Sequence, residues 1–132
     1  MVTETRARPA LTTEDAIATV GVKDLKVSRK FYEGTLGFEA AESDSDSVTY
    51  RSGGTKLFVY QSQFAGTNKA TAVTWVTRDV DSLVAGLKEH GVRFEHYDML
   101  EMKRQGDVHV AGNTRAAWFK DPDGNVMALV SM

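Results

Sequence analysis

Two stretches of the chain carry the same order of apolar and polar positions. One opens with the β-branched run from Ile17 to Val22, and the other opens with the run from Ala72 to Thr77. Short runs of this kind, bounded by polar residues, predict strands. In both stretches an aspartate, a helical pattern and a glycine follow. A supersecondary unit that occurs twice predicts two copies packed together, with a ligand groove between them.

The helical patterns begin at Asp24 and Asp79, whose carboxylates can accept hydrogen bonds from the free amides of a first helical turn. Apolar positions then recur three and four residues apart, which predicts one buried face on each helix. These faces consist of Leu25, Ser28, Phe31, Tyr32 and Leu36 in the first helix, and of Val80, Leu83, Val84 and Leu87 in the second. We expect Gly37 and Gly91 to end the helices, because glycine accepts a left-handed backbone conformation.

The residues after each helix predict further strands. In the first copy, residues 38–41 predict a strand, residues 43–45 a turn, and residues 48–51 and 56–60 a hairpin around Ser52-Gly53-Gly54. In the second copy, residues 92–97 predict a strand, and residues 116–120 and 126–130 a closing hairpin around Asp121-Pro122-Asp123-Gly124-Asn125. Each copy is therefore a β-α-β-β-β module, and the expected fold class is α+β.

The two modules differ in length. Asp24 and Asp79 are 79 − 24 = 55 positions apart, whereas Gly54 and Gly124 are 124 − 54 = 70 positions apart, so module two carries 70 − 55 = 15 additional residues. They fall within residues 98–113, which we expect to be a surface connection or a functional loop. We divide the chain into a flexible leader (1–14) and a single domain (15–132). The domain consists of module one (about 15–63), a connector (about 64–70) and module two (about 71–132).

Composition excludes several classes of function. The 132 residues are 42% hydrophobic and 26% charged, with a net charge of −2, so neither nucleic acid nor an anionic membrane is an expected partner. The chain has no cysteine, which rules out disulfides, thiolate metal sites and cysteine nucleophiles. No apolar run approaches the roughly 20 residues that span a bilayer. The start of the chain has no apolar signal core, and we expect a cytoplasmic protein.

Two segments resemble a known superfamily. Residues 22–38 (VKDLKVSRKFYEGTLGF) resemble the opening of the glyoxalase/bleomycin-resistance/extradiol-dioxygenase group, also called the vicinal oxygen chelate superfamily. Residues 118–129 (WFKDPDGNVMAL) resemble its closing hairpin. The resemblance implies paired β-α-β-β-β modules whose mostly antiparallel strands form a half-open, barrel-like sheet with the helices outside. It also implies a homodimer.

Metal-dependent members of this superfamily hold a divalent ion with His and Glu side chains from four strands. At the matching positions this chain has Ile17, Phe58, Ala72 and Ala128. Hydrocarbon side chains offer no donor atom to a divalent cation. We therefore expect no metal and no other cofactor in the groove.

Strand alternation sends every second residue to the same face of a sheet. On the face with the four former ligand positions, the candidate ligand-binding residues are Thr19, Phe58, Tyr60, Thr74, Trp118, Val126 and Ala128. Apolar and aromatic walls with a few hydroxyls suit a flat, hydrophobic small molecule. The alternative is that these side chains fill the interior of the sheet or form a dimer interface.

Among the three histidines, His109 is the candidate general acid or base, because it lies in the long segment of module two. We interpret His90 and His96 as structural. A metal site from Glu95, His96, Asp98, Glu101 and His109 matches no known ligand spacing. Three hypotheses follow: a metal-free small-molecule-binding protein; a lyase, isomerase, hydrolase or oxygenase without metal or with a relocated metal; or a structural or regulatory dimer.

Overall fold

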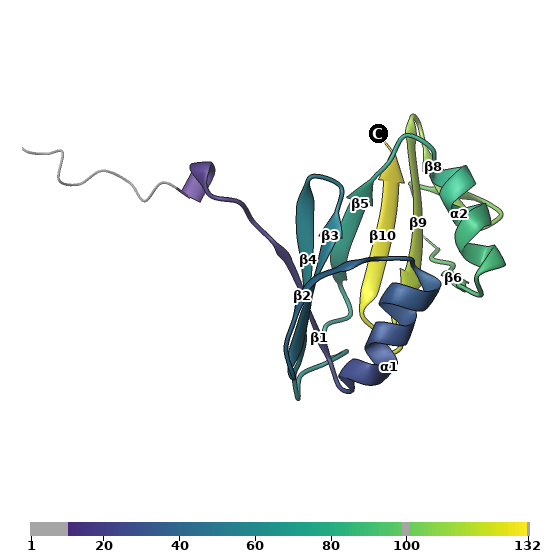
Figure 1. The fold of residues 1–132 in the computed structure, drawn as a ribbon. Helices are drawn as coiled ribbons and strands as arrows, with labels where there is room; N and C mark the ends of the chain where they lie inside the picture. Colours follow the sequence, from purple (N-terminus) through teal and green to yellow (C-terminus); the bar gives the residue numbers. More distant parts are fainter. Residues whose placement is uncertain (1–10, 99–100, 132) are drawn as a thin grey trace, which may run out of the picture.

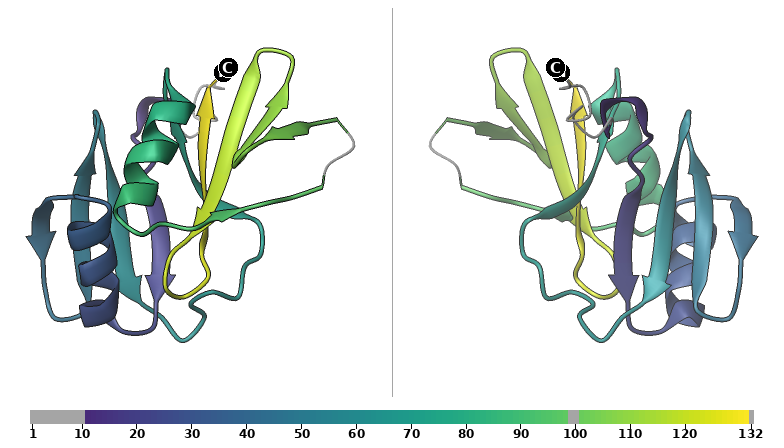
Figure 2. Two further views of the ribbon diagram at one scale, coloured as in Figure 1. Left: turned by 90° about the vertical axis from the view of Figure 1, so that its right-hand side faces the viewer. Right: turned by 90° about the vertical axis from the view of Figure 1, so that its left-hand side faces the viewer.

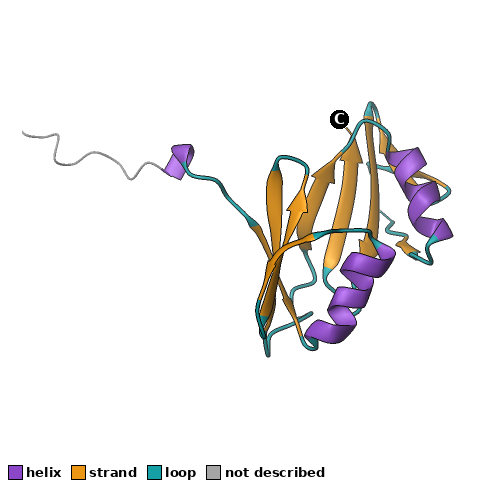
Figure 3. Cartoon of the chain, viewed as in Figure 1, coloured by secondary structure: helices purple, strands orange, loops and turns teal. Residues whose placement is uncertain are grey.

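The computed structural model describes residues 11–98 and 101–131 as two mixed β-sheets with helices on one face (Figures 1 and 3). Module one contains β1 (Ala18–Val22), α1 (Leu25–Arg29), the π-helix η3 (Lys30–Thr35), β2 (Ala40–Ser43), β3 (Ser47–Ser52) and β4 (Thr55–Gln61). Module two contains β5 (Thr71–Val76), α2 (Val80–Glu89), β6 (Phe94–Glu95), β7 (Lys103–Gln105), β8 (Val108–Ala111), β9 (Thr114–Lys120) and β10 (Val126–Ser131). A short 3₁₀ turn, η2 (Leu11–Thr13), precedes β1, and residues 1–10 of the predicted leader lie outside the described part of the chain.

The sheets have related topologies. Module one has the strand order β1-β4-β3-β2, and module two has the order β5-β10-β9-β8-β7 with β6 also paired to β9. The β1–β4 and β5–β10 pairs are parallel, and the other described pairs are antiparallel. The two sheets meet where β1 contacts β5, and they do not close into a barrel. This architecture confirms the predicted α+β class.

Both helices cover the same face of the strands, as the two side views in Figure 2 show. We call this the helix-covered face, and the opposite side the helix-free face. The predicted caps are confirmed: Asp24 accepts from the amides of Lys26 and Val27, and Asp79 accepts from the amide of Ser82. The helix after Asp24 ends near Gly37 as expected, but its second half is a π-helix in which the amide of Leu36 donates to the carbonyl of Phe31.

The strand predicted at residues 92–97 is wrong in length, because only Phe94 and Glu95 pair with β9. The same edge of β9 is occupied further along by β8, where His109 pairs with Ala116. The 98–113 segment is also not a simple loop. It contains the β7–β8 hairpin, which widens the sheet of module two, and its residues 99–100 lie outside the described part.

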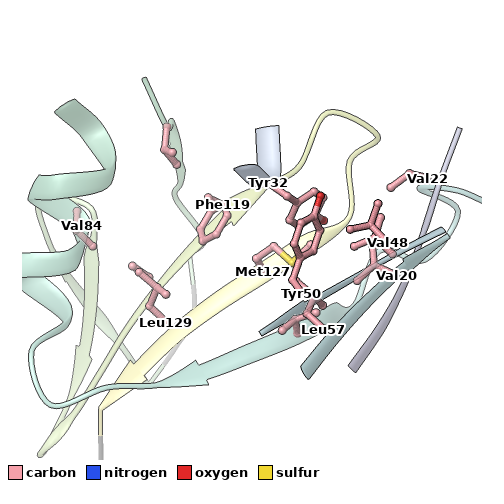
Figure 4. Close-up of a cluster of buried hydrophobic side chains, with 14 of the residues drawn as sticks. Val20, Val22, Tyr32, Val48, Tyr50, Leu57, Val84, Phe119, Met127 and Leu129 are labelled. Atoms are coloured by element: carbon pink, nitrogen blue, oxygen red, sulfur yellow. The ribbon is translucent and has the colours of Figure 1, made fainter. Parts of the chain in front are cut away.

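One apolar core joins the modules on the helix-covered face (Figure 4). It contains Val20, Val48 and Leu57 from module one and Phe119, Met127 and Leu129 from module two, all of which are buried. Fully burying such a side chain stabilises the fold by about 1.5–3 kcal/mol. Residues of both modules therefore contribute to one buried cluster.

Asp121 is the polar centre of this junction. It is buried, and its Oδ2 accepts from the Tyr32 hydroxyl and from Asn125 Nδ2, both at 2.8 Å. Its Oδ1 accepts from the backbone amides of Asp123 and Asn125 at 2.9 Å. Asn125 also donates to the carbonyl of Gly21 in β1. Burial, followed by the charge of Asp121, raises the pKa of Tyr32 far above its usual range. The closing turn of module two is therefore fixed to the helix and first strand of module one.

Candidate functional site

The helix-free face carries the seven predicted ligand-binding residues. In module one, Thr19 of β1 lies next to Phe58 of β4 in register, and the rings of Phe58 and Tyr60 stack with centroids 5.8 Å apart. Thr19 and Tyr60 are exposed, whereas Phe58 is half-buried. In module two, Thr74 of β5 is exposed beside Ala128 of β10. The sheets therefore present an aromatic surface with hydroxyl groups on this side.

The side chain of Trp118 in β9 extends across the neighbouring strand β10. Its Nε1 donates to Thr71 Oγ1 at 3.2 Å, although β10 lies between β9 and β5. Because Ala128 pairs with Trp118 and Val126 pairs with Thr71, the indole must pass over β10 at these two residues. Val126 and Ala128 are accordingly buried, with 2% of Ala128 exposed. In this arrangement they support the indole and offer almost no surface of their own.

His109 lies in strand β8 and not in a loop, and only 1% of it is exposed. Its Nε2 accepts from the backbone amide of Tyr97 at 2.9 Å, and its ring stands perpendicular to that of Trp118 at 4.9 Å. Because Nε2 accepts, the proton of the neutral ring is on Nδ1. This Nδ1 is buried and has no hydrogen-bond partner in the described residues. An unpaired buried donor of this kind costs about 1–3 kcal/mol.

The other two histidines lie at the surface. The His90 ring is within hydrogen-bond distance of the carbonyl of Gly86, one turn back along α2. His96 Nε2 and Lys88 Nζ each lie 2.7 Å from a carboxylate oxygen of Asp107. These hydrogen bonds, that of Lys88 first, lower the pKa of Asp107. The contacts hold the β7–β8 turn against α2.

The side chains do not fit a metal ion at the positions used by metal-dependent relatives. Phe58 and Ala128 occupy strands β4 and β10, Ala72 lies at the irregularity where β5 pairs with β10, and Ile17 precedes β1. Within residues 11–98 and 101–131, no three His, Asp or Glu side chains are grouped to hold a metal. His96 and Glu95 are instead paired with Asp107 and Lys120. We therefore derive no chemistry through a metal.

A cleft of about 370 Å³ lies on the helix-covered face, between the β3–β4 turn and α2. Its lining includes Leu36, Phe38, Arg51, Trp75, Leu83 and Leu87. Sequence reasoning did not find this site, because most of these residues have the pattern of core positions. No local signal marks the site: Arg51 and Ser52 end strand β3 at a hairpin turn, and only the packing of the two modules brings that turn near α2.

The fold and the site define a paired-module α+β protein with an apolar, aromatic strand surface and no metal-binding set at the expected positions. The sequence matches the Glyoxalase/Bleomycin resistance protein/Dioxygenase superfamily over residues 15–129. The chain belongs to this superfamily. No curated protein sequence gives a match. Among the described residues no helix is long and apolar enough to cross a membrane.

Solved structures show the same fold. A glyoxalase/bleomycin resistance protein from Catenulispora acidiphila superposes with a TM-score of 0.67 at 22% identity, over 89% of this chain and 97% of that one. TnmS3, an antibiotic binding protein from Streptomyces sp. CB03234, gives 0.64 at 23% identity over 90% and 97%. FosX, a fosfomycin resistance protein from Listeria monocytogenes, gives 0.68 at 18% identity over 91% and 93%.

Proposed function

We propose that this protein binds an apolar or aromatic small molecule without a metal ion. The observation that supports the proposal most is the identity of Ile17, Phe58, Ala72 and Ala128 at the four positions where metal-dependent relatives carry ligands. These side chains replace donor atoms with hydrocarbon, which favours contact with apolar surface over coordination of an ion. Sequestration of a compound needs only such binding, and no catalytic group.

The relatives support a role with small molecules. One structural neighbour is an antibiotic binding protein, and another is a fosfomycin resistance protein. Because fold alone does not fix function, these names add to the argument from the side chains and do not replace it. We propose a cytoplasmic location, which the absence of cysteine favours.

The proposed ligand surface consists of Thr19, Phe58, Tyr60, Thr74 and Trp118, with Val126 and Ala128 supporting the indole from below. Aromatic rings bind flat molecules by stacking, and the two threonine hydroxyls can orient a polar substituent. Tyr60 on this face is 38% exposed, and Ile17, which directly precedes β1, is 45% exposed. We propose that a second copy of the chain covers this open face and encloses the ligand as a homodimer.

Two tryptophans make this proposal testable, because the chain has only Trp75 and Trp118. Their indole N–H groups give two signals in a ¹⁵N–¹H correlation spectrum, which the variants Trp75→Phe and Trp118→Phe assign. The experiment titrates a panel of uncharged planar aromatic compounds in EDTA. The proposal predicts that at least one compound moves the Trp118 signal saturably and raises the melting temperature. If no compound in a broad panel does either, the proposal is wrong.

An enzyme is the second candidate, and one observation favours it: the unpartnered Nδ1 of His109. A neutral imidazole with a free N–H can donate to a ligand oxygen and can act as a general acid or base. The reaction would need the ligand to enter beside Trp118, where His109 is now covered. Loss of a detected turnover in His109→Gln, with ligand affinity retained, would favour this candidate over simple binding.

A further inference from the structure

We infer that the cleft on the helix-covered face is a second binding site, which takes a flat aromatic molecule with one carboxylate. The cleft measures about 370 Å³, within the range of roughly 300–1,000 Å³ that is typical of small-molecule sites. It is lined by Trp75, whereas the proposed ligand surface contains Trp118 on the opposite face. The inference therefore does not depend on the proposed function.

A stack of three rings forms the apolar part of the cleft. The Trp75 ring lies between those of Phe38 and Phe119, with centroids 5.9 Å and 6.2 Å away. Trp75 Nε1 donates to Ser52 Oγ at 2.9 Å, which fixes the indole to the β3–β4 turn. A platform that is already ordered loses little side-chain entropy when a ligand binds.

Aliphatic side chains face this platform from α2. Leu83 and Leu87 line the cleft from one helix face, and Leu83 is still 41% exposed. Val76, at the end of β5, also lines the cleft and is highly exposed. An aromatic ring of a ligand that covers these side chains removes apolar area of both the protein and the ligand from water, which favours binding.

The polar groups of the cleft are donors. Arg51 has no hydrogen bond or ion pair through its guanidinium within the described part of the chain, and it lines the cleft. Ser52 Oγ accepts from Trp75, and Thr77 Oγ1 accepts from the amide of Asp79, so both hydroxyl hydrogens remain free to donate. Two of the nearby carboxylates are already used, because Asp79 caps α2 and Asp81 pairs with Arg115. Glu39, whose backbone carbonyl accepts from the Arg51 amide, has no ion pair among the described residues.

One cation and two hydroxyl donors beside an aromatic platform complement an anionic acceptor on an apolar body. A carboxylate matches a guanidinium with two parallel hydrogen bonds, and a single carboxylate balances the single charge of Arg51. The geometry thus selects an aromatic carboxylic acid over a neutral hydrocarbon or a cation.

The test uses 2-naphthoate as the probe and follows the two indole N–H signals of the full chain. We expect 2-naphthoate to move the Trp75 signal saturably and to leave the Trp118 signal in place. The uncharged analogue 2-naphthamide should bind about tenfold more weakly, and Arg51→Gln should weaken 2-naphthoate binding about as much. Lys103→Gln makes the same change of charge on β7, away from the cleft, and should leave the affinity unchanged. Leu83→Trp, which fills the mouth of the cleft, should abolish binding.

Three results would overturn the inference. The first is a Trp75 signal that stays fixed throughout the titration. The second is equal affinity of the protein for 2-naphthoate and 2-naphthamide, or equal affinity of the parent protein and Arg51→Gln for 2-naphthoate. Either result would show that the carboxylate does not contribute to binding. The third is a Trp75 signal that moves on dilution without any probe, because a second copy of the chain would then occupy the cleft. A fixed Trp118 signal with every compound would instead refute only the proposed function.

Discussion

The hydroxyl of Tyr32 donates a 2.8 Å hydrogen bond to Oδ2 of Asp121, which lies 89 positions further along the chain. Both side chains are buried. The bond joins the helix of module one to the closing turn of module two. Hydrogen bonds to buried charged groups contribute more than neutral ones, at about 1.5–3 kcal/mol.

Tyr32→Phe should therefore lower the free energy of unfolding by about 1.5–3 kcal/mol, because Asp121 loses a donor while its charge stays buried. Urea unfolding measures the change, with the m-value (the dependence of the free energy of unfolding on urea concentration) the same in both proteins. Tyr60→Phe is the matched control, since the Tyr60 hydroxyl is exposed and forms no hydrogen bond within the described residues; it should change stability by less than about 0.5 kcal/mol. Equal losses in the two variants would show that the bond does not fasten the modules.

Gly66 in the connector is the glycine at which a side chain would be least tolerated. Its φ is +69°, and an added Cβ would collide with the backbone carbonyl of Asp123 in the closing turn. Gly66→Ala should destabilise the protein by more than about 2 kcal/mol, because strain and a backbone clash combine. Gly53→Ala has a similar positive φ but open space, and should cost only about 1 kcal/mol. A smaller loss at Gly66 than at Gly53 would contradict the close approach of connector and turn.

Glu33 should make stability depend on pH in the acid range. The hydrogen bond from Arg29, at 2.6 Å, is the main cause that lowers the pKa of Glu33, and the Tyr50 hydroxyl adds to it. A carboxyl whose pKa is lowered by folding stabilises the fold above its unfolded pKa, about 4.3, and loses that contribution as pH falls through the folded pKa.

Glu33→Gln should therefore be less stable than the parent protein at pH 7, by at most about 1 kcal/mol because the pair is partly exposed, and equally stable at low pH. Urea midpoints between pH 2.5 and pH 7 provide the measurement. Glu39→Gln, at an exposed residue with no ion pair among the described residues, should show no such convergence. A gap that widens toward acid pH would refute the assignment.

His109 offers a test of the buried contact to Tyr97. His109→Phe keeps an aromatic ring beside Trp118 but leaves the Tyr97 amide without its acceptor, which costs about 1–3 kcal/mol. Removal of the unpaired Nδ1 offsets part of this cost, so the net loss of stability should be smaller. His109→Gln retains a side-chain oxygen that can accept from the same amide, so the loss should be smaller. Amide hydrogen exchange at Tyr97 reports the bond directly, and should be fast in the Phe variant and slow in the Gln variant. Equally fast exchange in both would mean that His109 does not hold this segment.

The features of this fold that could be predicted are those determined by residues close together in the sequence. Asp24 and Asp79 cap helices because their carboxylates meet free amides within three residues, and such contacts can be read from the sequence. The hairpin at Gly53 follows from similar local preferences. The Tyr32–Asp121 bond and the three-ring stack around Trp75 depend on how the modules pack, which no local pattern encodes.

The long segment shows the same limit. The sequence predicts a surface connection or a functional loop at residues 98–113, whereas the structure has strand β8 there, which pairs with residues 114–116 of β9 beside β6. This pairing places His109 in a strand, where it is buried. The ligand-binding surface itself remains a prediction: alternation places its residues on one face, and only binding experiments establish what they hold.

The most direct test of the central claim measures the affinity of the tightest planar compound from the panel by calorimetry in three solutions: one with EDTA, one with added Zn²⁺ and one with added Mn²⁺. If hydrocarbon has replaced the metal ligands, the dissociation constant is the same in all three solutions, and Trp118→Ala weakens it. Binding that occurs only with a divalent ion, or a failure to bind any compound in any of the three solutions, would contradict the account.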